Sequence, residues 1–133
     1  MNSEAVDAPR VLIADDNREI RELIVRILQQ DGYAIEAVDD GNKAIEKITE
    51  ASFDAILLDF MMPLASGFDV IKWIEANRPD VARGCVIIIT AAVRDLKSFD
   101  TSTVFAAIRK PFEIAELRDT VRACVAAKVA VAS

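Results

Sequence analysis

Four short apolar runs in this sequence end in polar side chains that are suited to chemistry. Asp15 and Asp16 follow the first run, Asp59 ends the second, Thr90 the third, and Lys110 comes just after the fourth. Each residue alone has an ordinary structural explanation, such as capping a helix or closing a strand. Short motifs match by chance, but five such residues at successive strand ends rarely do. The set therefore predicts a functional site.

The chemistry of this set is that of a metal-assisted phosphoryl transfer. Three carboxylates placed together repel one another unless a cation joins them. Mg²⁺ prefers six oxygen ligands, so two or three carboxylates and a backbone carbonyl suit it. With Mg²⁺ and the Lys110 ammonium the charges nearly balance. A carboxylate nucleophile can then form an acyl phosphate, while the cations and the Thr90 hydroxyl hold its oxygens.

The apolar runs themselves predict buried β-strands, and helical spacing follows each strand. A further run at residues 33–38 alternates with a charged residue and is typical of an edge strand. The expected strands are residues 11–14, 33–38, 55–59, 85–90 and 104–108. The first expected helix has an apolar stripe from Ile20 to Leu28 and stops at Gly32, and the second spans residues 42–50. The third is capped by Ser66 and ends before Pro79, and a weakly helical stretch follows at residues 93–102. The last helix is marked by Ile114, Leu117, Val121, Cys124 and Val125.

Five strands alternating with helices predict an α/β fold with a single doubly wound, five-stranded parallel sheet. We expect the flavodoxin-like strand order 2-1-3-4-5, in which strands 1, 3, 4 and 5 are neighbours and bring their polar ends to one crevice. Residues 1–9 are expected to form a flexible leader, residues 10–127 one domain, and residues 128–133 a tail that is apolar enough to extend the last helix.

Composition excludes several classes of protein. A chain of 133 residues fits one domain, and the absence of histidine excludes His-based triads and the usual zinc sites. A net charge of -6 without a Lys/Arg cluster argues against direct nucleic-acid binding. No apolar run approaches the roughly 20 residues that cross a bilayer, and no export signal is visible. With Cys85 and Cys124 in apolar surroundings, we expect a cytoplasmic protein that does not bind membranes.

Taken together, the motifs resemble the receiver domain of response regulators in two-component signalling, from residue 10 to about residue 127. The resemblance rests on "DD" after the first strand and on D-x-x-M-P at Asp59, Met62 and Pro63. It rests further on Gly67 eight positions after the aspartate, on "TA" from Thr90, and on "KPF" from residue 110 to residue 112. Each motif alone is weak, but the set is highly specific.

The resemblance implies the role of each acidic residue. Asp59 would be the phosphoacceptor, and Mg²⁺ would be held by Asp15, Asp16, Asp59 and the backbone carbonyl of Met61. The phosphoryl donor would be a phosphohistidine on a histidine kinase or a histidine phosphotransfer protein. This chain, which has no histidine, would be the receiver.

The resemblance also implies the contacts of the phosphoryl group and the structural positions around them. Thr90, Lys110 and the backbone of Ala91 would contact the phosphoryl group. The peptide bond before Pro111 would be cis, as in the family. Gly67 would hold a structural position in the loop after the phosphoacceptor.

The sequence departs from the receiver pattern at positions that concern switching and phosphoryl lifetime. Receivers usually carry Tyr or Phe three residues before the lysine, where its rotation reports phosphorylation, but Ala107 occupies that position. Phe105 lies on the same face of the strand and could partly substitute, although we expect it to be a core residue. Apolar Met61 and Ala92 stand where polar residues can orient a hydrolytic water, which predicts slow intrinsic dephosphorylation.

We therefore expect a phosphorylation-switched signalling module and not a conventional enzyme. Phosphorylation would change the binding of a downstream effector protein to the face formed by residues 93–102, strand 104–108 and the last helix. One alternative is a pseudo-receiver that binds proteins without being phosphorylated. A less favoured alternative is a phosphohydrolase that passes through an aspartyl phosphate, but such enzymes place a second aspartate where this chain has Met61.

Overall fold

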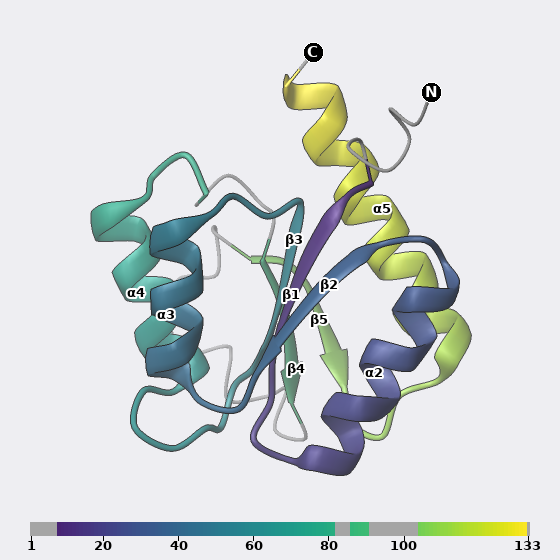
Figure 1. Ribbon diagram of the computed structural model, residues 1–133, viewed down its shortest axis with the longest axis horizontal. Coiled ribbons are helices and arrows are strands. Elements are labelled where there is room, and N and C mark those ends of the chain that lie inside the picture. Colours follow the sequence, from purple (N-terminus) through teal and green to yellow (C-terminus); the bar gives the residue numbers. More distant parts are fainter. Residues whose placement is uncertain (1–7, 82–85, 91–103, 133) are drawn as a thin grey trace.

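The computed structural model describes residues 8–81, 86–90 and 104–132, with side chains to residue 127. Five strands and four helices lie within these ranges (Figure 1), and they alternate along the chain except that the fifth strand is the next described element after the fourth. In order they are β1 (Arg10–Ala14), α2 (Arg18–Gln30), β2 (Ala34–Val38), α3 (Gly41–Glu50), β3 (Ala55–Asp59), α4 (Gly67–Asn77), β4 (Val86–Thr90), β5 (Val104–Arg109) and α5 (Ile114–Ala132). The expected helix at residues 93–102 lies outside the described residues.

The strands form one parallel sheet in the order β2-β1-β3-β4-β5, which confirms the predicted α/β, flavodoxin-like arrangement. Helices α3 and α4 cover one face of this sheet, and α2 and α5 cover the other (Figure 1). The carboxyl ends of β1, β3, β4 and β5 therefore meet at one edge of the sheet. This edge is where a doubly wound fold places its ligand site.

Burial follows position in the sheet. Every residue of the central strands β3 and β4 is buried, as continuous apolar strands covered on both faces should be. The edge strands β2 and β5 are only partly buried. Our expectation that Phe105 is a core residue is wrong, because its side chain is 37% exposed. It lies on the outer strand β5, where period-2 alternation buries Ile108 in the core and leaves Phe105 and Ala107 exposed.

The helix stripes predicted from apolar spacing are buried at most positions and exposed at two. Ile24, Ile27 and Leu28 of α2 are buried, and so are Leu117, Val121 and Cys124 of α5. Leu23 is 39% exposed because it lies beside the buried face of α2, and Ile114 is 48% exposed because it is the first residue of α5. Helix α5 runs on to Ala132, as the apolar tail predicted.

Helices α2, α3 and α4 begin at polar side chains that accept hydrogen bonds from the first turn. Ser66 caps α4, as predicted, and forms a reciprocal capping box with Asp69. Asp40 caps α3 by accepting a hydrogen bond from the Lys43 N–H at 2.8 Å. Asn17, and not Asp15 or Asp16, caps α2. Both aspartates are thus free of the ordinary capping role that would have explained them structurally.

Two glycines permit close approaches that shape the loops near β3. A Cβ on Gly67 would lie 2.8 Å from the Asp59 carbonyl oxygen, and a Cβ on Gly41 would collide with the backbone of Ala65. The start of α3 and the start of α4 therefore both pack directly on the loop that follows Asp59. A side chain at Gly67 would not fit against the backbone of Asp59 and Phe60.

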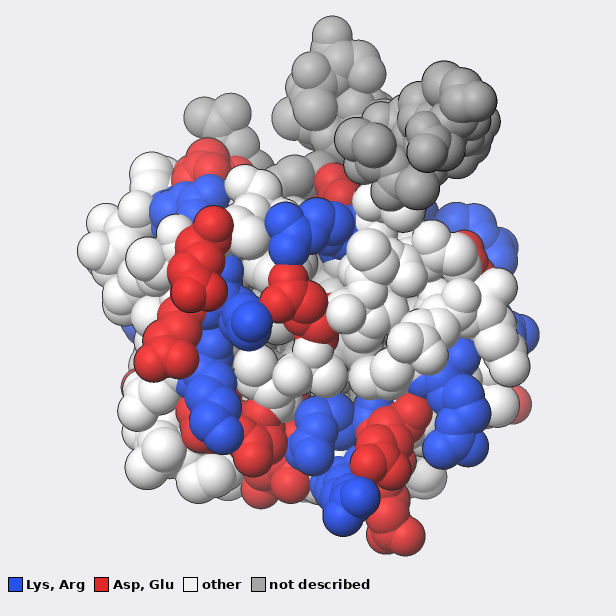
Figure 2. All heavy atoms as spheres, in the orientation of Figure 1, with Lys and Arg blue, Asp and Glu red and all other residues white. Residues whose placement is uncertain are grey.

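Acidic and basic side chains are interleaved on the face that carries β2 and its neighbouring helices (Figure 2). Glu36 on β2 forms ion pairs with Arg10 at 2.6 Å and with Lys47 at 2.9 Å. Charged side chains of this kind protect an edge strand from pairing with another chain. Among the described helices, none combines the length and the apolar character that a membrane span requires.

Candidate functional site

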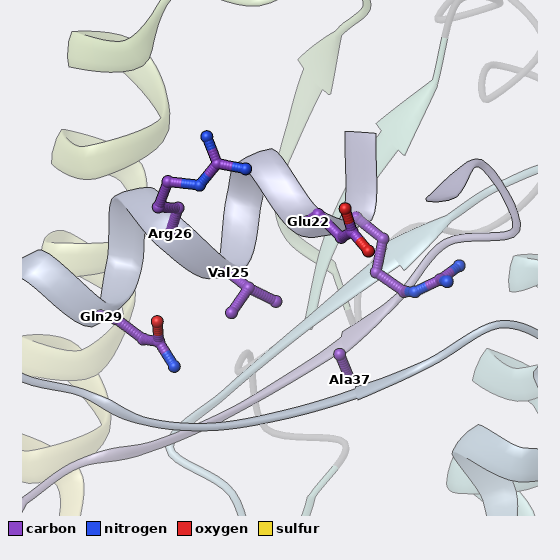
Figure 3. Close-up of a pocket in the computed structure, with 6 residues that line it drawn as sticks. Glu22, Val25, Arg26, Gln29 and Ala37 are labelled. Atoms are coloured by element: carbon purple, nitrogen blue, oxygen red, sulfur yellow. The ribbon is translucent and has the colours of Figure 1, made fainter. Parts of the chain in front are cut away.

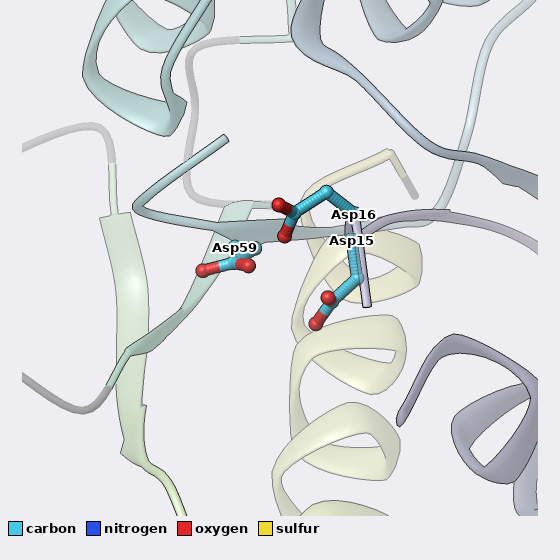
Figure 4. Close-up of side chains that lie close together, drawn as sticks. All are labelled: Asp15, Asp16 and Asp59. Carbon is cyan, nitrogen blue, oxygen red and sulfur yellow. The ribbon is translucent and has the colours of Figure 1, made fainter. Parts of the chain in front are cut away.

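Three carboxylates meet at the carboxyl ends of β1 and β3. Asp15 and Asp16 directly follow β1, and Asp59 is the last residue of β3 (Figure 4). One oxygen of each lies within 4.8 Å of an oxygen of the other two. Asp15 and Asp59 are buried, at 1% and 5% exposure, whereas Asp16 is exposed. The predicted acidic triad is thus assembled, with its opening on the Asp16 side.

Asp15 is held in place by three hydrogen bonds. Its N–H donates to the Val38 carbonyl at 3.2 Å, and its Oδ1 accepts from the Asn17 N–H at 2.8 Å. Its backbone carbonyl accepts from Nη1 of Arg21 at 2.8 Å. Arg21 was not among the site residues that the sequence suggested. The sequence does place Arg21 six residues after Asp15, on the second turn of the following helix, and this spacing could have indicated that its side chain reaches back to Asp15.

Arg21 also lines a groove of about 290 Å³ between α2 and β2. Glu22, Val25, Arg26 and Gln29 of α2 face Ala37 of β2 across this groove (Figure 3). The lining mixes charges, since it contains Glu22 together with Arg21 and Arg26. Arg21 therefore contacts both this groove and the Asp15 carbonyl.

Lys110 joins the site from the end of β5. Its Nζ lies 3.1 Å from Oδ2 of Asp15 and 3.2 Å from Oδ2 of Asp59. Burial opposes the charge on this lysine, but the two carboxylates outweigh burial and raise the pKa of Lys110. Its N–H donates to the Thr90 carbonyl at 3.0 Å, and the Lys110–Pro111 bond is cis, as predicted.

Asp59 sits in an environment that opposes its charged form. Burial first, and the Asp15 carboxylate second, raise the pKa of Asp59 to about 6. The Met61 N–H, which donates to Oδ1 of Asp59 at 3.1 Å, and the Lys110 ammonium limit this rise. The carboxyl group is therefore still mostly ionised at neutral pH, and an additional cation would favour its charged form.

The residues present fit a magnesium ion. Oδ2 of Asp15 is buried and, apart from its ion pair with Lys110, has no hydrogen-bond partner among the described residues, so it has acceptor capacity to spare. Three carboxylates and one ammonium leave a charge of about -2, which a divalent cation neutralises. Hard oxygen donors are the ligands that Mg²⁺ prefers. Asp15, Asp16 and Asp59 would hold the ion, and the ion would supply charge neutralisation for an incoming phosphoryl group.

The remaining predicted residues lie around this centre. Thr90 is buried at the end of β4, beside the strand that carries Asp59. Met61 is 65% exposed, so an apolar side chain stands in the loop just beyond the acidic triad. Ala91 and Ala92 lie outside the described residues.

Comparison with known proteins agrees with this geometry. A family model for the response regulator receiver domain matches residues 11–122. The chain is 33% identical over 118 residues to the response regulator MprA of Mycolicibacterium vanbaalenii and 34% identical over 118 residues to that of Mycobacterium ulcerans. Each match covers 86% of this chain and 49% of the relative, so the chain spans about half the length of the curated relatives it matches.

Solved structures agree with the sequence matches. The response regulator TrrA of Thermotoga maritima, in complex with Mg²⁺–BeF, has a TM-score of 0.78 and 29% identity, with 87% of this chain and 98% of that chain covered. The chemotaxis response regulator CheY4 of Vibrio cholerae has a TM-score of 0.79 and 26% identity, with 88% and 98% covered. The chain belongs to the response regulator receiver domain family of two-component signalling.

Proposed function

We propose that this domain accepts a phosphoryl group on Asp59 from a phosphohistidine of a donor protein, and that the phosphorylated form binds a partner differently. Aspartate phosphorylation and Mg²⁺ binding are typical of the family. The observation that carries the proposal is the meeting of three carboxylates within 4.8 Å beside the Lys110 ammonium. Such a site suits the transfer of a phosphoryl group to one of its own oxygens.

The proposed transfer uses Asp59 as the nucleophile. An Asp59 oxygen attacks phosphorus in line with the donor imidazole, the N–P bond breaks as the O–P bond forms, and the imidazole nitrogen keeps the electron pair and takes up a proton. The Met61 N–H orients Asp59 through Oδ1. Lys110, now paired with Oδ2, can move onto a phosphoryl oxygen, and the Thr90 hydroxyl can donate to another. These contacts supply electrostatic stabilisation to the transition state.

The proposed partners rest on the family to which the chain belongs. The donor is a histidine kinase or a histidine phosphotransfer protein, and this chain, which has no histidine, cannot be its own donor. A downstream effector protein would bind the face that contains β5 and α5, where Phe105 and Ala107 are exposed. The domain itself would bind neither nucleic acid nor a membrane, and it would act in the cytoplasm. The activity is self-directed, so the domain is no conventional enzyme.

Intact-mass measurement after incubation with acetyl phosphate and MgCl₂ tests this proposal. We expect a gain of one phosphoryl group in the parent and none in Asp59→Asn. A parent chain that gains no phosphoryl group, from acetyl phosphate or from phosphorylated kinases, would support the pseudo-receiver alternative. Many turnovers of a phosphoester would instead support a phosphohydrolase.

A further inference from the structure

The loop that follows the phosphoacceptor closes on itself. The Gly67 N–H donates to the Phe60 carbonyl at 3.0 Å, so residues 60–67 leave β3 and return to the same point. Compact surface loops whose ends meet in this way are often functional. At the far end of this loop, the Ala65 N–H donates to the Pro63 carbonyl at 2.8 Å, and Leu64 between them has a φ of 69°. This combination is a γ-turn with positive φ, which is rare and strained.

Leu64 is an unexpected residue for such a turn. A positive φ is uncommon outside glycine, asparagine and aspartate, and is unfavourable for a bulky side chain. Leu64 also gains nothing from burial, because its side chain is 78% exposed. No other large hydrophobic side chain is more exposed among the described residues, and Met61 in the same loop follows at 65%. A strained backbone that displays an apolar side chain to solvent is a reason to look for a binding role.

The position of the loop identifies what would contact it. Asp59 is only 5% exposed and Asp15 only 1%, so a protein that carries a phosphohistidine must press against the rim of the crevice to bring phosphorus to Asp59. The loop begins at the residue after Asp59 and is fixed there by Gly67, whose Cα packs on the Asp59 carbonyl. Its exposed apolar side chains therefore stand beside the path of an incoming donor protein. A small-molecule donor has no need of this contact.

We infer that Leu64, together with Met61, forms an apolar contact for the protein that donates the phosphoryl group. The matching surface is an apolar patch next to the phosphohistidine of the donor. Burying one exposed leucine removes enough apolar surface from water to change the stability of the complex with the donor measurably. This inference rests on the proposed function, since it concerns how the same site receives its phosphoryl group.

Comparison of two donors tests the inference. The protein donor is the autophosphorylated kinase that phosphorylates the parent chain fastest in a panel of purified histidine kinases, and the small donor is acetyl phosphate. Leu64→Asn keeps a residue that tolerates positive φ and removes the apolar contact. We expect transfer from the kinase to fall at least fivefold in Leu64→Asn, while the rate with acetyl phosphate stays within a factor of two of the parent. Leu64→Met, the matched control, should keep the kinase rate within a factor of two.

The outcomes separate this inference from the proposed function. Equal rates from both donors in Leu64→Asn and the parent would overturn the inference and leave the function standing. Equal slowing with both donors would also overturn it, because the loop would then act on the chemistry itself. If the parent forms a dimer that Leu64→Asn abolishes while the kinase rate is unchanged, the occupant is a second copy of the chain and not the donor. A melting temperature of Leu64→Asn equal to that of the parent, together with its unchanged rate with acetyl phosphate, shows that slower transfer from the kinase is not a loss of folding.

Discussion

The Lys110 ammonium lies 3.2 Å from Oδ2 of Asp59, although β4 separates the strands that carry these two residues. The same ammonium lies 3.1 Å from Oδ2 of Asp15, at the end of β1. One cation therefore links three strand ends across the sheet. Because Lys110 directly follows β5, it connects Asp59, the proposed phosphoacceptor, directly to the edge strand β5.

This connection predicts that Lys110→Ala separates phosphorylation from its structural consequence. Asp59 should still accept a phosphoryl group from acetyl phosphate, while backbone amide NMR shifts at Ala106, Ala107 and Ile108 should change much less than in the parent. Arg109→Ala removes an exposed neighbouring cation and is the control. Amide shifts in Lys110→Ala as large as those of the parent would show that another route carries the signal.

The raised pKa of Asp59 predicts how the stability of the metal-free domain depends on pH. The folded state binds this proton more tightly than the unfolded chain, because the pKa rises from 3.8 to about 6. Folding stability should therefore fall as pH rises from about 4 to about 6, by at most about 3 kcal/mol. Asp59→Asn should abolish this loss and be more stable than the parent by about 1–3 kcal/mol at pH 8.

Urea unfolding of both proteins in EDTA, at pH 4 and at pH 8, measures this difference. The two proteins should have similar free energies of unfolding at pH 4 and differ at pH 8. Asp119→Asn, which alters an exposed carboxylate paired with Arg122, should show no such gain. An Asp59→Asn variant that is less stable than the parent at pH 8 would mean that the Lys110 ion pair outweighs carboxylate repulsion.

The bond from Arg21 to the Asp15 carbonyl predicts a role in magnesium binding. Without this donor, the peptide between Asp15 and Asp16 loses a hydrogen bond that fixes the orientation of both carboxylates. Arg21→Met should weaken Mg²⁺ binding roughly 10-fold by isothermal titration calorimetry, and Arg21→Lys should recover part of the loss. Arg26→Met, in the same groove but without a bond to Asp15, should bind Mg²⁺ like the parent.

The exposed apolar side chain of Met61 predicts a long-lived phosphoryl group. A polar residue at this position could orient a water molecule toward the acyl phosphate, and methionine cannot. Met61→Gln should therefore shorten the half-life of phosphorylated Asp59 by roughly fivefold, because the glutamine amide can hydrogen-bond the attacking water and position it toward phosphorus. Decay of acid-labile ³²P from the isolated domain gives the half-life. Loss of the label from the parent within seconds would contradict the prediction.

The sequence was enough to predict the sheet and the acidic site, because both depend on local patterns. Continuous apolar runs identify strands that are covered on both faces, and the residues that end them must meet at one edge. Strand order then brings Asp15, Asp59 and Lys110 together without further information. The cis bond before Pro111 was predicted only through the family resemblance.

Three features could not be read from the sequence, because each depends on neighbours from elsewhere in the chain. Period-2 alternation places Phe105 and Ala107 on one side of β5, but it cannot tell which side the rest of the fold buries. The bond between Arg21 and the Asp15 carbonyl becomes visible only once α2 is docked on the sheet. The positive φ of Leu64 contradicts the preference of leucine, so sequence reasoning would place it elsewhere.

Transfer from a ³²P-labelled phosphohistidine of a purified kinase to this chain tests the central claim most directly. With Mg²⁺ present, the label should move to the parent chain and not to Asp59→Asn, and chelation of Mg²⁺ with EDTA should suppress the transfer. Asp119→Asn removes a carboxylate that is far from the acidic triad in sequence, and this variant should accept the label at the rate of the parent. A parent chain that takes up no label, or an Asp59→Asn variant labelled as fast as the parent, would contradict the assignment of Asp59 as the phosphoacceptor.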